Sequence, residues 1–163
     1  MKLNKADANA WIATPPPDRP GTLIHGDDAM RVALKRQELI ANLTGPDAEE
    51  EMRITRLQAA DLSGDKAALA DAVKAQGFFP GPRAVLVEDA TNNQAKVVLA
   101  ALDDWRPGDA HMVVTAKAQK PSSALRKAFE SHKATACIGV YDEPMSRADI
   151  AEAQSKAGLT RVD

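Results

Sequence analysis

Five short apolar segments, each followed by a stretch that favours a helix, are the feature that most constrains the fold of this chain. They cover residues 22–25, 52–57, 83–88, 111–115 and 136–141. Strands that alternate with helices form βαβ units, and the right-handed crossovers of such units place helices against both faces of a parallel sheet. The sequence therefore predicts an α/β fold, with a five-stranded parallel sheet and helices on both faces.

Two of the segments indicate their own place in the sheet. Residues 84–87 are apolar on both faces, which is typical of a central parallel strand, whereas residues 52–57 alternate apolar and polar, as at a sheet edge. Helices are expected to begin at Asp27 or Asp28, at residues 63–65, at Asn92 or Asn93, and at residues 121–123. The core side of the first of these helices is expected to carry Val32, Leu34, Leu39 and Leu43.

The composition limits the class of protein. With 163 residues the chain holds one ordinary domain and at most the beginning of a second. A formal charge of -2 does not favour nucleic-acid binding by the whole domain, so contact with DNA is expected to be local or through a partner. The single cysteine, Cys137, excludes an internal disulfide. Because we find neither a bilayer-length apolar run nor a secretory apolar core, we expect a soluble, cytoplasmic protein without membrane contact.

Residues 76–82 form an aromatic segment, Gln-Gly-Phe-Phe-Pro-Gly-Pro, that cannot continue a helix because of its prolines and glycines. Neighbouring side chains in an extended loop tend to point to opposite sides, so we expect at least one of Phe78 and Phe79 to face solvent. An exposed aromatic pair indicates a hydrophobic plug for a partner's pocket. The alternative, in which both rings pack beneath the sheet, stays open at this point.

The turn after the first strand does not fit a phosphate-binding loop. If the motif G-x-x-x-x-G-K-[ST] began at Gly26, then Arg31, Val32 and Ala33 would occupy the positions of glycine, lysine and the hydroxyl residue. Asp27 and Asp28 would in addition repel a phosphate. The dinucleotide motif G-x-G-x-x-G is also lacking, and we expect the domain to bind no nucleotide cofactor.

The other candidates for chemistry have simpler structural explanations. Glu88 and Asp89 follow an apolar strand as a magnesium-binding pair does, yet without a lysine partner an aspartate there is usually a turn residue. Thr115 either senses a γ-phosphate or simply ends its strand. The three histidines lack metal-ligand spacing and are expected to be structural or exposed, Cys137 is expected to be buried, and two cations are expected on a solvated helix face. These residues are His25, His111 and His132, and the cations Arg126 and Lys127.

In their joint order, four segments resemble the N-terminal part of the delta subunit of the bacterial DNA polymerase III clamp loader. They are residues 23–28, 76–79, 83–88 and 125–129, and they span most of residues 20 to 141. The resemblance implies a P-loop NTPase or AAA+-like fold whose degenerate nucleotide site no longer binds ATP. It also implies a non-catalytic subunit of a DNA-directed DNA polymerase holoenzyme, which opens the ring-shaped sliding clamp during DNA replication.

The same resemblance implies the clamp-binding residues and the domain organisation. Phe78 and Phe79 match the apolar plug that enters the clamp's peptide pocket, with Gln76 at the polar position before them, although leucine is common where this chain has Phe78. The expected domains are a clamp-binding domain, residues 1–142, and a linker with the first helix of a helical lid, residues 143–163. The expected partners are the sliding clamp and, through a longer protein, other loader subunits, with DNA contacted only indirectly.

Two other classes of function remain open from the sequence. One is an atypical P-loop-like ATPase or kinase that uses Arg31 or Lys35 for phosphate and Asp89 for magnesium. The other is a receiver-type regulatory domain, for which Asp89 and Lys117 come near the required acceptor and lysine.

Overall fold

A single parallel sheet organises the molecule. The computed structural model describes residues 1–16, 18–75 and 77–140. Its sheet has the strand order β2-β3-β4-β1-β5. The strands are β1 (Gly21–Gly26), β2 (Ile54–Gln58), β3 (Ala84–Ala90), β4 (His111–Ala116) and β5 (Ala136–Val140). Every pairing between them is parallel, which confirms the predicted five-stranded α/β fold.

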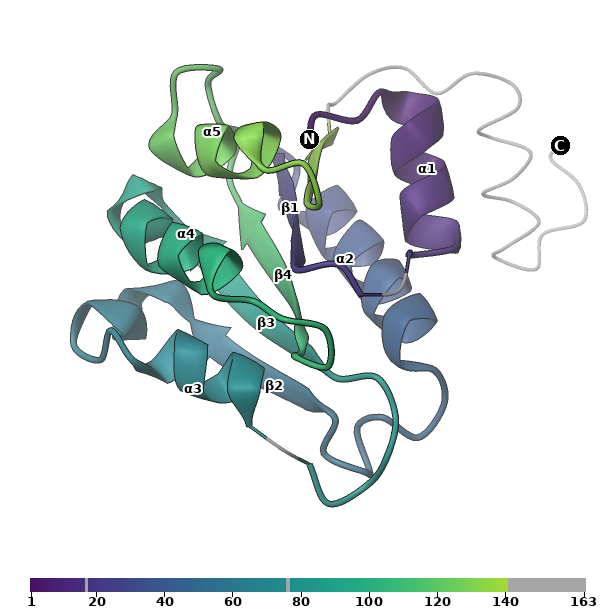
Figure 1. Cartoon of the computed structure of the whole chain (residues 1–163). Coiled ribbons are helices and arrows are strands. Elements are labelled where there is room, and N and C mark those ends of the chain that lie inside the picture. The colour runs from purple at the N-terminus through teal and green to yellow at the C-terminus, as the bar shows by residue number, and fades with distance from the viewer. Residues whose placement is uncertain (17, 76, 141–163) are drawn as a thin grey trace, which may run out of the picture.

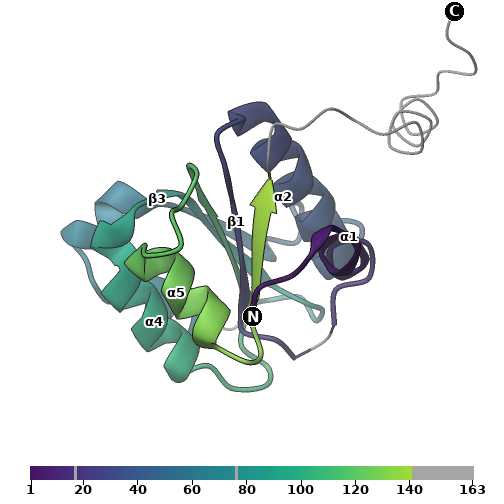
Figure 2. The same cartoon turned by 90° about the horizontal axis from the view of Figure 1, so that it is seen from above.

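Helices cover both faces of this sheet (Figures 1 and 2). On one face lie α1 (Lys5–Ala13) and α2 (Ala29–Thr44), and on the other lie α3 (Ala68–Lys74), α4 (Ala95–Asp103) and α5 (Ala124–Ser131). Two short 3₁₀ helices, η1 (Ala59–Ser63) and η2 (Asn92–Gln94), precede α3 and α4.

The core is divided into two hydrophobic clusters because alternate residues of a strand point to opposite faces. In β1, Leu23 belongs to the cluster under α3, α4 and α5, whereas Ile24 belongs to the cluster under α1 and α2. The neighbouring pairs Val85 with Leu86 and Met112 with Val113 divide in the same way. Continuous apolar runs are therefore needed in the inner strands, since both of their faces are buried.

The edge and interior positions of two strands agree with the sequence. β2 lies at one edge of the sheet, as its alternating pattern predicted. β3 pairs with β2 on one side and β4 on the other, and its residues 84–87 are buried. The middle strand is nevertheless β4, so β3 is an interior strand rather than the central one.

Some details of the helices differ from the expectations. Asp28 caps α2 and Ser123 caps α5, but the cap before η2 is Thr91, in a capping box with Gln94, rather than an asparagine. The helix expected from residues 63–65 begins only at Ala68, because residues 59–63 form η1. Leu34 is 57% exposed, so its placement on the core side was wrong. It lies two residues after the buried Val32, about 200° around the helix.

The predicted boundary at residue 142 and the helix expected from Ser146 lie outside the described residues, so this division into domains stays a prediction. Within the ranges that the structure describes, no helix is both long and apolar enough to cross a membrane.

Candidate functional site

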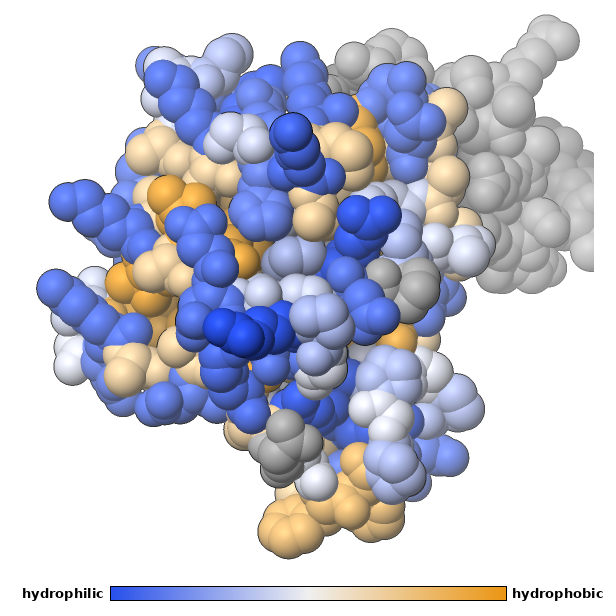
Figure 3. Space-filling view, viewed as in Figure 1, coloured by the Kyte–Doolittle hydropathy of each residue, from blue (hydrophilic) through white to orange (hydrophobic). Residues whose placement is uncertain are grey.

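The loop between α3 and β3 carries two phenylalanines at the amino end of the sheet. This aromatic loop, residues 77–82, leaves Phe78 91% exposed and Phe79 45% exposed. In Figure 3 hydrophobic surface gathers at the lower end of the molecule, where Figure 1 shows this loop. The alternative in which both rings pack beneath the sheet is therefore wrong. Gln76 lies outside the described residues.

A third apolar side chain lies beside the loop. Met52, in the turn between α2 and β2, is 65% exposed. Its backbone has a φ of 57°, a left-handed conformation that methionine seldom adopts. Met52 and Gly77 line the same small cavity, of about 70 Å³, together with Arg83 and the start of β3. The aromatic loop and the α2–β2 turn thus border one hollow.

Arg53 connects that turn to the aromatic loop, and the sequence analysis missed it. Its side chain is only 5% exposed. Its Nη1 donates to the carbonyl of Pro82 at 3.0 Å and also to the carbonyl of Thr44, while Nη2 donates to the carbonyl of Pro46 at 2.8 Å. Nε donates to the carboxylate of Glu51 at 2.9 Å. The alternating pattern of residues 52–57 had indicated a strand position with a wetter face, but Arg53 precedes β2 and is buried.

At the opposite, carboxyl end of the sheet, the β1–α2 turn is occupied by the protein's own groups. The Asp28 carboxylate accepts hydrogen bonds from the amides of Met30 and Arg31 at 3.0 and 3.2 Å. Its other oxygen lies 3.4 Å from Nε of Arg31. Amides at a helix N-terminus are the groups that would bind a phosphate. Here a carboxylate already holds them.

Gly26 and Val32 have structural roles in the same turn. A Cβ on Gly26 would lie 2.1 Å from the carbonyl oxygen of Val140, so glycine is required by the approach of β5. Val32, at the position of the phosphate-loop lysine, is 6% exposed and belongs to the core. The glycine that suggested a test for a phosphate loop is thus explained by sheet packing.

The two acidic residues near the end of β3, Glu88 and Asp89, have different surroundings. Glu88 is bonded by Nη1 of Arg36 and by the side-chain amide of Gln58, each at 3.4 Å. Asp89 is exposed, with a φ of 58°, where the β3–β4 register shifts between Val87 and Ala90. Asp89 thus lies within β3, at an irregularity of the ladder, and not in the turn that was expected for it. Across the part of the chain that the structure describes, no three His, Cys, Asp or Glu residues form a group that could hold a metal ion.

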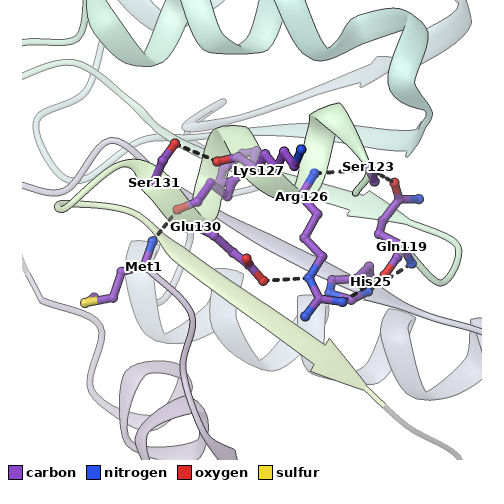
Figure 4. A network of polar contacts seen from close by, with 9 residues as sticks. Met1, His25, Gln119, Ser123, Arg126, Lys127, Glu130 and Ser131 are labelled. Atoms are coloured by element: carbon purple, nitrogen blue, oxygen red, sulfur yellow. Dashed lines mark hydrogen bonds and ion pairs between the residues drawn. The ribbon is translucent and has the colours of Figure 1, made fainter. Parts of the chain in front are cut away.

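A buried polar network lies beside the carboxyl end of β1 (Figure 4). Arg126 donates from Nε to Glu130 at 2.6 Å and from Nη1 to the carbonyl of Gln119 at 3.0 Å. His25 accepts from the Gln119 amide at 3.3 Å. Burial, together with the nearby charge of Arg126, lowers the pKa of His25 to about 4. Placing Arg126 on a solvated face was wrong, because that side of α5 packs over this end of the sheet; Lys127 is exposed as expected.

The remaining candidates are structural. His111 is 6% exposed, and burial lowers its pKa to about 4. Thr115, at 7% exposure, lies near the end of β4. His132 accepts a hydrogen bond from the amide of Ala134 at 3.3 Å. Cys137 is buried in β5, and burial raises the pKa of its thiol to about 11, as expected of a small core residue rather than a nucleophile.

Comparison with known proteins bears on the fold. No protein-family model and no curated protein matches the sequence. Among solved structures, the chain is similar to a DNA polymerase III, gamma subunit-related protein from Thermotoga maritima, with 15% identity and a TM-score of 0.56. The match covers 92% of this chain but 49% of that structure, so the chain spans about half its length. At this identity the likeness shows the fold alone: the chain shares the α/β fold of that protein.

Proposed function

We propose that this chain is a non-catalytic clamp-loader domain that binds the bacterial DNA polymerase sliding clamp through its aromatic loop and promotes ring opening during DNA replication. The observation that carries the proposal is the exposure of Phe78, 91%, beside Phe79, 45%, on a loop between prolines and glycines. Soluble proteins gain nothing from two adjacent exposed rings unless a partner covers them. The fold shared with a DNA polymerase III, gamma subunit-related protein supports the choice of partner.

The two rings can supply much of the binding energy. Burial of one aromatic side chain contributes about 1.5–3 kcal/mol, and a micromolar complex corresponds to about 8 kcal/mol. Phe78 has the larger area left to bury and is proposed as the leading plug residue, with Phe79 beside it. Gln76 is proposed as the polar contact before them.

Ring opening in this proposal needs no chemistry in the domain. Binding energy that favours a distorted clamp interface shifts the clamp toward its open state. ATP would act on neighbouring loader subunits, because here Asp28 occupies the helix amides and Val32 replaces the phosphate-binding lysine. In this proposal, the contacts with those subunits are made by other parts of a longer protein. DNA is contacted only indirectly, through the assembled loader, and the protein acts in the cytoplasm.

The test is a calorimetric titration of the chain against the sliding clamp from the same genome. The Phe78→Ala, Phe79→Ala double variant is expected to lose binding while its melting temperature changes little, since both rings are outside the core. A matched control is the Met30→Ala, Leu34→Ala double variant, which removes two exposed apolar side chains from α2. The control should bind normally. Equal affinity of the aromatic double variant and the parent chain would overturn the proposed function.

A further inference from the structure

Arg53 is a buried cation that pairs with Glu51 through Nε and whose Nη1 and Nη2 donate to backbone carbonyls of two different loops. Pro82 ends the aromatic loop, while Thr44 ends α2 and Pro46 follows it. The backbone of Arg53 adds two further hydrogen bonds: its amide donates to the carbonyl of Ala48 at 2.8 Å, and its carbonyl accepts from the amide of Ala84 at 2.9 Å. One residue thus joins the α2–β2 turn to the end of the aromatic loop and the start of β3.

The aromatic loop is shaped around this guanidinium. Gly81 has a φ of 129°, a region that is rarely open to other residues. A Cβ at Gly81 would lie 3.2 Å from Nη1 and 3.3 Å from Cδ of Arg53, so the loop backbone packs directly against the side chain. Lysine cannot replace these contacts, because its single ammonium group lacks the planar fork that reaches carbonyls on several sides.

We propose that Arg53 is the positioning residue of the aromatic loop, which it holds in the one arrangement that presents Phe78 and Phe79 to the partner. The inference rests on the proposed function. A loop that is ordered before binding loses less conformational entropy on association, so its affinity is higher than that of the same rings on a loose loop. Arg53 itself is buried and need not touch the partner.

The experiment compares three variants of the full chain: Arg53→Lys, Gly81→Ala and Gly108→Ala. Gly81→Ala disturbs the loop while Arg53 is retained. Gly108→Ala is the matched control, since Gly108 also has a positive φ, 101°, but a Cβ there meets nothing within 4 Å. For each variant, hydrogen exchange of the loop amides, affinity for the sliding clamp and melting temperature are measured.

Arg53→Lys and Gly81→Ala are expected to speed exchange of the loop amides selectively and to weaken clamp binding by about tenfold. Gly108→Ala should change neither the exchange of the loop amides nor the affinity for the clamp. Unchanged loop exchange in both variants, or faster exchange with parental affinity, would overturn the positioning role. If Arg53→Lys does not fold, the loop exchange and clamp affinity of Gly81→Ala decide whether Arg53 positions the loop. Failure of the parent chain itself to bind would overturn the proposed function, while the exchange data would still decide whether Arg53 orders the loop.

Discussion

The buried histidine His111 shows how a single side chain makes folding depend on pH. Its Nδ1 lies 2.8 Å from the carbonyl of Arg19 and must donate to it, which leaves Nε2 to accept from the Thr22 hydroxyl at 2.9 Å. The Thr22 hydroxyl in turn accepts from the indole of Trp11 at 2.9 Å. The chain of hydrogen bonds therefore fixes a neutral ring, and protonation of Nε2 would break it.

We predict that the free energy of unfolding falls as the pH drops through this histidine's titration range. The pKa of His111 is lowered from 6.5 to about 4, so its neutral form stabilises the protein fully above 6.5, and this stabilisation is lost as the pH falls toward 4. The slope is up to about 1.4 kcal/mol per pH unit. His25, with the same direction of shift, adds a similar contribution.

Urea unfolding between roughly pH 7 and pH 5 measures this slope, in a range where most carboxylates are still ionised. His111→Gln should show a shallower dependence on pH than the parent chain, even if its stability at neutral pH is lower. Parallel pH profiles would contradict the prediction.

At the scale of single elements, Asp28 is the N-cap of α2, and its carboxylate occupies the amides that would otherwise bind a phosphate. Asp28→Ala is expected to lower the free energy of unfolding by about 1 kcal/mol, because the amides of Met30 and Arg31 lose their acceptor. Asp27→Ala is the matched control, since Asp27 is exposed and the cap is formed by Asp28. Chemical denaturation measures the free energy of unfolding of both variants. Equal losses in the two variants would show that the cap contributes nothing specific.

Strands were more predictable than helix starts because burial of both faces leaves a strong local pattern. All five strands fall within two residues of their expected starts, since each apolar run corresponds to one buried strand. Helix starts depend on which of several polar residues provides the cap. Thr91 was missed in favour of its asparagine neighbours, and a 3₁₀ helix delayed α3 to Ala68.

In the candidate site, the exposure of a side chain was predictable only where residues next to it in the sequence determine it. Exposure of at least one ring followed from two adjacent aromatics among prolines and glycines, and both proved exposed. Arg53 and Arg126 looked like ordinary surface cations, yet both are buried. Their acceptors are mostly backbone carbonyls, such as those of Pro82 and Gln119, and only the folded chain brings these close. Sequence patterns contain no signal for such contacts.

In the whole molecule, the proposed partner surface and the turn tested for a phosphate loop lie at opposite ends of the strands. The aromatic loop precedes β3, whereas Asp28 follows β1 and the acidic pair lies near the carboxyl end of β3. A partner bound at the aromatic loop, as proposed, would therefore not touch the carboxyl end of the sheet directly. In the proposed function, this separation means that the absence of nucleotide binding at the carboxyl end does not affect partner binding by the aromatic loop.

This arrangement predicts that magnesium ATP changes neither the melting temperature of the chain nor its affinity for the sliding clamp. A ligand present at about 100 times its dissociation constant stabilises the folded state by about 2.7 kcal/mol, which raises the melting temperature of a domain of this size by several degrees. Thermal unfolding with and without millimolar ATP is therefore a sensitive measurement. A rise that is lost in Arg31→Ala or Asp89→Asn would support the ATPase alternative. An unchanged transition would agree with the proposed function, in which ATP acts on other subunits.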